Sequence, residues 1–336
     1  MKVLVVEPGP EFSVKDVATG WAKGLALCGA EVRTFDTGAV LAFYEQHPHI
    51  AGRPDDGFVA ADMAARALRS AIYDFWPDVV LIVSGFFVPP DTYRLLRHRG
   101  HKLVVLLTES PYEDDNQLGV AAAADIAVIN DPTNLDRFLE VNPNSYYQPH
   151  AYDPDLHRPR NIGSAPDLRS DFAFVGTGYP SRAEFFEAVD WHGIDVALAG
   201  NWTNLPPESP LIKYLAHDQA HCCPNDQTVW LYSGTKASAN LYRREAQRFD
   251  LARGWAMSPR EVELAACGVF YLTEPRGENR EVLPMVPTFE HPDDFGEQLR
   301  WWLTHDDERI AVAQAARAAI SDRTFANHAA LLLGRL

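Results

Sequence analysis

The chain has 336 residues, which is too long for one ordinary core and suits two domains of about 100–200 residues each. Hydrophobic residues make up 46% and charged residues 23%, so the composition is that of a globular protein and excludes a disordered scaffold. The formal net charge of −16 disfavours nucleic acid and anionic lipid as general partners, because phosphate binding depends on clustered Lys and Arg.

The first half alternates short apolar runs with longer amphipathic stretches. Continuous apolar strands separated by helices are typical of a parallel sheet covered on both faces. In chain order we expect strands at 3–6, 31–35, 79–83, 103–107 and 126–129, and helices at 14–27, 59–75, 93–98 and from about residue 134.

Prolines and other helix breakers between Pro149 and Ser170 indicate an interdomain connection. The alternation then resumes, with strands at 172–175, 195–199 and 269–273, strand or loop–strand segments at 230–232 and 237–241, and helices from 181 and at 260–266, 295–303, 310–320 and 325–333. We therefore expect an α/β protein with two doubly wound Rossmann-like domains, residues 1–155 and 156–320, facing across a cleft. The C-terminal helix, 321–336, is expected to cross back to the first domain. Ligands of such sheets bind beyond the carboxyl ends of the strands.

Two glycines, Gly176 and Gly178, follow the strand at 172–175, and a capping-box pattern at Ser181 starts a helix. Glycines let the backbone approach a bound anion, and free N–H groups at a helix start point toward it. A dinucleotide fingerprint has a third glycine where this chain has Ser181, so the turn fits a phosphate or a sugar diphosphate better than NAD. A plain tight turn explains the glycines equally well.

The segment from residue 258 to residue 281 joins a helix, a strand and a polar turn. The helix carries Arg260 and Glu263 and stops at Gly268. A carboxylate on this helix can accept both ribose hydroxyls of a nucleotide, and the turn offers N–H groups and arginines to a diphosphate. The candidate residues of the turn are Glu274, Arg276, Gly277, Glu278, Asn279 and Arg280. The alternative is that the glutamates form a solvated helix face.

The run from His217 to Cys223 contains His and Cys, which are the usual zinc ligands, but its spacing matches no standard structural zinc pattern. We favour a surface loop with a buried cysteine and expect no metal. The four cysteines do not form a secreted disulfide framework. The start of the chain reads as a strand rather than a signal peptide, and no apolar run approaches the about 18 residues of a membrane span. We expect a cytoplasmic protein.

In order and spacing, these motifs resemble those of the GT-B glycosyltransferases, and within them the CgeB-like (spore-maturation type) group, which has members in actinobacterial phages. The similarity is most specific at residues 258–274. It also covers 9–18, 148–154, 172–178 and 199–202, and so spans most of the chain.

The resemblance implies that the second domain binds a nucleotide sugar and the first domain an acceptor. By matching position, Glu263 would hold the ribose, the 274–281 turn would hold the diphosphate or sugar, and Asn201 belongs to a donor-side motif. Lys236 and Arg260 are candidate cations for the phosphates. Because fixed cations and N–H donors can stabilise a leaving diphosphate, we expect transfer without a metal or cofactor. The acceptor stays open among a virion protein, a modified DNA base and a glycan.

The sequence departs from the family pattern at one position. Many retaining enzymes carry a second glutamate eight residues before the ribose glutamate, where this chain has Trp255, so the stereochemical outcome stays open. An inverting enzyme needs a general base near the acceptor hydroxyl. Asp16 and Glu109 are candidates because both follow strands of the first domain. Either can instead be a helix N-terminal acid that the helix dipole favours.

Two other classes of function compete with sugar transfer. The first is a binding protein that recognises a nucleotide or glycan without turnover, and Trp255 keeps this alternative open. The second is a nucleotide-sugar epimerase or an NAD-type oxidoreductase, which the incomplete glycine fingerprint disfavours. A phage-encoded member would work in the host cytoplasm.

Overall fold

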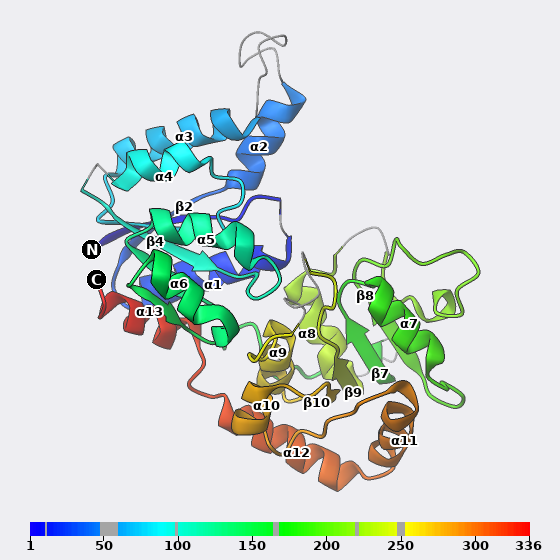
Figure 1. The fold of residues 1–336 in the computed structure, drawn as a ribbon. Helices are drawn as coiled ribbons and strands as arrows, with labels where there is room; N and C mark the ends of the chain where they lie inside the picture. The colour runs from blue at the N-terminus through cyan, green and yellow to red at the C-terminus, as the bar shows by residue number, and fades with distance from the viewer. Residues whose placement is uncertain (11, 48–59, 98–99, 164–167, 219–221, 247–252) are drawn as a thin grey trace. The chain divides into compact units, whose positions relative to one another are not determined.

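The computed structural model describes residues 1–10, 12–47, 60–97, 100–163, 168–218, 222–246 and 253–336. It divides into two compact units. The first consists of Met1–Pro149 and Phe325–Leu336, and the second consists of His150–Thr324. Each unit holds one parallel sheet with helices on both faces (Figure 1). The expected α/β architecture with two doubly wound parts is confirmed.

The first unit has a six-stranded sheet in the order β2-β1-β3-β4-β5-β6, and every pairing is parallel. Its strands are β1 (Lys2–Val6), β2 (Glu31–Phe35), β3 (Val79–Val83), β4 (Lys102–Leu107), β5 (Ile126–Ile129) and β6 (Ser145–Tyr147). The helices between them are α1 (Phe12–Leu27), α2 (Thr37–Gln46), α3 (Ala60–Phe75), α4 (Pro90–Arg97), α5 (Asp114–Ala123) and α6 (Leu135–Val141).

Helix cover on both faces explains why the central strands are almost entirely apolar. All five residues of β3 are buried. One core joins alternate strand residues such as Leu4 and Ile82 to Leu68 of α3, Leu96 of α4 and Phe138 of α6. A strand whose two faces are both covered cannot alternate polar and apolar residues, so continuous apolar runs mark the interior of a parallel sheet.

The last helix, α13 (Phe325–Leu333), returns to the first unit and packs on α1. Two glycines of α1 make room for it. A Cβ at Gly20 would lie 2.2 Å from the Phe325 ring, and a Cβ at Gly24 would lie 2.5 Å from the Phe325 carbonyl oxygen. The Gln148 amide adds a hydrogen bond to the His328 carbonyl at 3.3 Å. The expected return of the C-terminal helix to the first unit is confirmed.

The second unit has a four-stranded parallel sheet in the order β10-β9-β7-β8. Its strands are β7 (Ser170–Val175), β8 (Val196–Ala199), β9 (Thr235–Asn240) and β10 (Phe270–Thr273). Its helices are α7 (Pro180–Ala188), α8 (Asn225–Gly234), α9 (Pro259–Cys267), α10 (Gly277–Val282), α11 (Pro292–Leu303) and α12 (Asp306–Ala319). An aromatic core lies beneath α7 and α11, and a second core lies beneath α8 and α9.

One expected segment differs in kind. Residues 230–232, expected as a strand or a loop–strand segment, lie within helix α8, and the strand begins only at Thr235. Val229 and Tyr232 of this helix are buried against α9, and tertiary packing therefore overrides the weak local β preference of the segment. No helix among the described residues combines the length and the apolarity that a membrane span requires.

Candidate functional site

The candidate site lies at the carboxyl edge of the second sheet, where the strand ends of a parallel sheet present loops to ligands. β7, β9 and β10 end at Val175, Asn240 and Thr273, and α9 starts at the same edge. Of the donor-side residues predicted from the sequence, Gly176 and Gly178 follow β7, and those between 274 and 280 lie in the turn after β10 and in α10. Arg260 and Glu263 lie on α9.

The two glycine loops of this edge pack directly on each other. A Cβ at Gly200, which has a φ of +102°, would lie 2.5 Å from the Gly176 carbonyl oxygen. The Gly178 N–H donates to the Asn201 carbonyl at 2.8 Å, and the Asn201 carboxamide oxygen accepts from the Thr203 hydroxyl at 2.8 Å. The glycines thus allow the loops after β7 and β8 to touch, which a side chain at either position would prevent.

Arg260 is fixed beside the first glycine. Its Nε donates to the Val175 carbonyl at 2.9 Å, and its Nη1 donates to the Asn240 Oδ1 at 3.3 Å. The guanidinium lies 4.6 Å from the centre of the Phe174 ring. A Cβ at Gly176 would be only 2.2 Å from Nη2 of this arginine. The structure therefore brings Arg260 and Gly176 together and holds a cation at the edge of the sheet.

Ser258 caps α9 and ties the helix to β9. Its hydroxyl donates to the Asn240 Oδ1 at 2.8 Å, and it forms a capping box with Glu261. The fully buried Glu261 carboxylate accepts hydrogen bonds from the Tyr242 hydroxyl, the Ser258 N–H, the Thr273 hydroxyl and the Asn279 carboxamide. Burial raises the pKa of this carboxyl. Glu261 thus connects the ends of β9 and β10 with the starts of α9 and α10.

Glu263, one half-turn further along α9, has a different environment. Its side chain is partly buried, and it has no hydrogen bond or ion pair within the described chain. The carboxylate lies near Tyr232 of α8 and near Cys267. Burial, aided by this negative charge, raises the pKa of the Cys267 thiol to about 12. Among the described residues, the Glu263 carboxylate is therefore not bonded to any internal donor.

The two acids of the turn after β10 are occupied internally. The Glu274 carboxylate accepts from the Tyr242 N–H at 2.7 Å and from the Arg244 guanidinium at 2.6 Å. The buried Glu278 accepts from the Met257 N–H at 2.6 Å and pairs with Arg323 at 2.7 Å. Both acids therefore bind the turn to neighbouring loops.

The rest of the turn is also largely satisfied. The Arg276 guanidinium lies 3.7 Å from the centre of the Tyr242 ring and donates to the Ala256 carbonyl at 2.9 Å. The Arg276 N–H is bonded to Asn279, and the Glu278 N–H is bonded to the carbonyl of Trp255. A Cβ at Gly277 would collide with the Trp255 ring, because it would lie 2.0 Å from Nε1. Arg280, on α10, is exposed.

Three predicted residues lie away from this edge. Lys236 is at the amino end of β9, where its ammonium pairs with Asp171 at 2.7 Å, so it lies at the opposite end of the sheet from the glycine loops. Asp16 on α1 and Glu109 after β4 belong to the first unit. Both are partly buried at the carboxyl edge of the first sheet, and the Glu109 N–H donates to the Gln117 Oε1 at 3.2 Å.

Sequence reasoning missed the buried Asn240 and Glu261 and the partly buried Ser258, the polar residues that join the loops of the edge. The serine, proline and glutamate at 258, 259 and 261 carry a capping-box signal that could have identified two of them. The zinc question at 217–223 falls partly on residues 219–221, which lie outside the described chain. Among the residues that the structure describes, no three His, Cys, Asp or Glu side chains gather as metal ligands would.

Comparison with known proteins shows which sequences this chain resembles. Residues 182–333 match the family described as Glycosyl transferase-like. Over 264 residues the chain is 24% identical to the spore protein CgeB of Bacillus subtilis (strain 168), an alignment that covers 77% of this chain and 82% of the relative.

Solved structures of similar fold cover nearly the whole chain. Sucrose-phosphate synthase from Thermosynechococcus elongatus aligns with a TM-score of 0.67 at 12% identity, over 99% of this chain and 97% of the other. Anabaena HepE in complex with UDP-glucose aligns with a TM-score of 0.64 at 13% identity, over 100% of both chains. A trehalose-6-phosphate protein from E. coli bound with UDP-2-fluoro glucose gives 0.63 at 11% identity, over 100% and 98%. At these identities the likeness concerns the fold, which is GT-B.

Proposed function

We propose that this chain is a glycosyltransferase of the GT-B fold that transfers a sugar from a nucleotide-sugar donor bound at the carboxyl edge of the second sheet. The observation that carries the proposal is the Glu263 carboxylate, which stands at the matching position on α9 and has no partner within the described chain. HepE was solved with UDP-glucose, which makes uridine nucleotides the first donors to test.

Each proposed role follows from chemistry at this edge. A carboxylate can accept hydrogen bonds from both ribose hydroxyls, which is the role proposed for Glu263. As the glycosidic bond breaks, negative charge builds on the leaving diphosphate, and a cation already held in place stabilises that charge without reorganising. Arg260, fixed beside Gly176, fits that requirement. The internal bonds of Glu274 and Glu278 leave them the role of holding the edge in shape.

The proposed mechanism uses no metal ion or cofactor, because the fixed arginine and backbone N–H groups supply the charge stabilisation. A chelator that leaves the rate of nucleoside diphosphate release unchanged supports this part of the proposal. A rate that falls with the chelator and returns with Mg²⁺ or Mn²⁺ contradicts it, while leaving the donor assignment intact.

Thermal unfolding with nucleotides tests the donor site. Millimolar UDP or GDP should raise the melting temperature of the wild-type chain by mass action. Glu263→Ala should weaken nucleotide binding about 10- to 150-fold, the equivalent of about 1.5–3 kcal/mol for charge-assisted hydrogen bonds. The matched control is Glu297→Ala, which removes an exposed glutamate on α11 and should keep the full shift. If no nucleoside diphosphate or nucleotide sugar shifts melting, the proposed donor site is wrong.

Release of nucleoside diphosphate from a panel of nucleotide sugars separates an enzyme from a non-catalytic binding protein. The proposal expects turnover by the wild type and a much lower rate for Glu263→Ala. Wild-type rates no higher than those of the variant, together with a normal nucleotide shift, favour the binding protein, for which the Trp255 position is the sequence argument.

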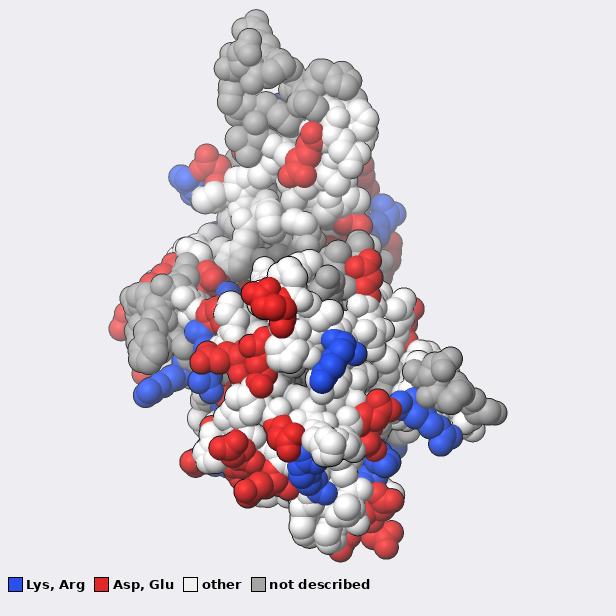
Figure 2. Space-filling model, turned by 90° about the vertical axis from the view of Figure 1, so that its right-hand side faces the viewer, with Lys and Arg blue, Asp and Glu red and all other residues white. Residues whose placement is uncertain are grey.

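The acceptor and its general base are the open parts of the reaction. On the face drawn in Figure 2, lysines and arginines are scattered among acidic residues, which gives that face no general affinity for DNA. Virion-type proteins, duplex DNA with hydroxymethylated bases and small glycans should be compared directly as acceptors. Asp16 and Glu109 are the proposed candidates for the base, so Asp16→Asn or Glu109→Gln should abolish transfer while donor binding persists.

A further inference from the structure

The first unit contains a cavity of about 380 Å³ between α3 and α4. All its lining residues belong to this unit, whereas the donor edge belongs to the second. Small-molecule sites in proteins measure about 300–1,000 Å³ and combine apolar walls with a few polar groups. The volume suits a ligand at the small end of that range.

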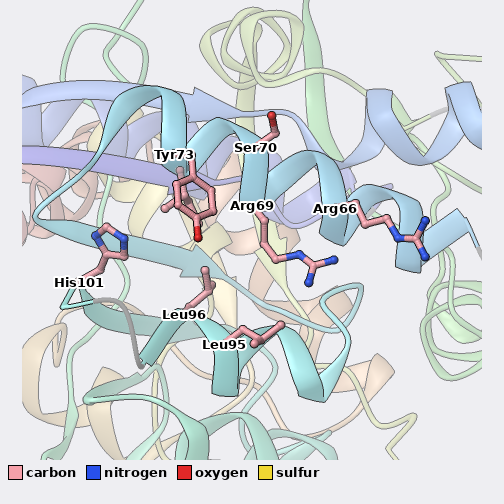
Figure 3. A pocket seen from close by; sticks show the side chains of 8 residues that line it. Arg66, Arg69, Ser70, Tyr73, Leu95, Leu96 and His101 are labelled. Atoms are coloured by element: carbon pink, nitrogen blue, oxygen red, sulfur yellow. The ribbon is translucent and has the colours of Figure 1, made fainter.

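The walls of the cavity combine an apolar floor with two cations. Figure 3 shows Tyr73, Arg69 and Arg66 in a row along α3, opposite Leu95 and Leu96 of α4. Within the described chain neither arginine has a hydrogen bond or an ion pair. The two arginines lie one turn apart without an acidic partner among the described residues, and guanidiniums match the oxygens of carboxylates and phosphates.

The rings of His101 and Tyr73 line the other end of the cavity. His101 lines the cavity and is 5% exposed, and its Nδ1 lies 2.6 Å from the Pro77 carbonyl. Nδ1 therefore donates to this carbonyl, and the buried Nε2 has no hydrogen-bond partner in the described chain. Beside it, Tyr73 and Trp76 are 50% and 56% exposed, with ring centres 5.9 Å apart. Half-exposed aromatic rings of this kind offer an apolar face next to water.

We propose that this cavity binds an anionic sugar, a hexose that carries a carboxylate or a phosphate group. Arg66 and Arg69 bind the anionic group, the Tyr73 ring and the two leucines contact the C–H face of the sugar, and sugar hydroxyls bond to the polar groups of the wall. The site does not depend on the donor edge and does not rest on the proposed donor.

Calorimetric titration of the full chain with glucuronate and with glucose 6-phosphate tests the site, with neutral glucose and inorganic phosphate as paired probes. Both anionic sugars should bind. The double variant Arg66→Gln/Arg69→Gln should lose about 10-fold or more in affinity, as expected when charge-assisted bonds are removed. Leu95→Glu, an exposed change that brings a negative charge to the wall, should also weaken binding. Arg94→Gln, on α4 but outside the cavity, is the matched control and should change affinity less than about twofold.

Several outcomes overturn the proposal. The proposal is wrong if neither anionic sugar binds at about 10 mM, a concentration that detects even millimolar affinity. It is also wrong if the double variant binds both sugars with wild-type affinity. Equal binding of inorganic phosphate shows that the cavity recognises charge alone, and equal binding of glucose shows that the arginines play no part. Glu263→Ala should bind the anionic sugars like the wild type, so a failure of the donor site and a failure of this site give different results.

Discussion

Replacing Glu261 by alanine should destabilise the second unit, because this carboxylate is the common acceptor for four donors. The Thr273 hydroxyl and the Asn279 carboxamide can still donate to the Glu274 carbonyl, at 3.0 and 3.1 Å. Among the described residues, the Tyr242 hydroxyl and the Ser258 N–H donate only to Glu261. Alanine therefore removes the acceptor of one buried and one partly buried donor and leaves a small cavity.

The size of the effect follows from these two donors. An unsatisfied buried donor costs about 1–3 kcal/mol, so two of them lower the free energy of unfolding by about 2–6 kcal/mol, with a centre near 4. For a unit of this length each kcal/mol shifts the melting temperature by about 2–4 °C. We expect Glu261→Ala to melt about 8–16 °C below the wild type.

Urea unfolding and thermal circular dichroism measure this change. Glu263→Ala is the matched control, because the two residues share helix α9 but only Glu261 is bonded to other described residues. The control should stay within about 0.5 kcal/mol of the wild type, as surface changes usually do. A loss below about 1 kcal/mol in Glu261→Ala, or an equal loss in both variants, would refute the argument that Glu261 holds the edge together.

Three further predictions follow from the same contacts. Gly176→Ala should push the Arg260 guanidinium away from its two acceptors. The variant should lose about 2 kcal/mol of unfolding free energy and bind nucleotides more weakly. An unchanged nucleotide affinity would contradict the placement of this arginine. Burial raises the folded-state pKa of Glu261 above 4.5, so stability that is fully present below pH 4.5 is lost as pH rises through the folded pKa. The side chain in Glu261→Gln cannot ionise. Urea titrations from about pH 4 to about pH 8 should therefore show the variant gaining stability relative to the wild type. If the difference in unfolding free energy between the two proteins does not change with pH, the pKa of Glu261 does not control stability. Lys236→Gln should lower the unfolding free energy by at most about 1 kcal/mol, because its ion pair is exposed. Calorimetry should show an unchanged nucleotide affinity, since Lys236 lies at the amino end of β9. A clear loss of affinity would support Lys236 as a phosphate ligand.

The order of elements was predictable because it depends on local patterns. Short unbroken apolar runs such as 79–83 and 103–107 are typical of strands buried on both faces, and the structure has β3 and β4 there. The return of the C-terminal helix to the first unit was also expected. Its physical basis is the space that two glycines of α1 leave for Phe325. These residues are about 300 positions apart in the chain, and no local pattern reveals such a contact.

Local sequence patterns gave the wrong prediction where contacts with distant segments decided the structure. The capping-box pattern at Ser181 forms no cap, because α7 begins with Pro180 and the Ser181 N–H donates to Glu245 instead. The capping box that does form is at Ser258, where the cap is reinforced by Asn240 from another strand. Residues 230–232 became helical for a similar reason, since Tyr232 is buried against α9.

By itself the sequence determined the fold class, the second unit as the one with glycine loops at a sheet edge, and Arg260 and Glu263 as neighbours on one helix. Tertiary structure alone decided which polar groups of that edge are already bonded within the protein. Glu274 and Glu278 looked like ligand-binding acids in the sequence, yet both carboxylates accept hydrogen bonds from loops that precede them by about 20–30 residues, whereas Glu263 does not. Hydrogen-bond satisfaction depends on distances between segments remote in the chain, and a linear pattern of residue types does not contain those distances.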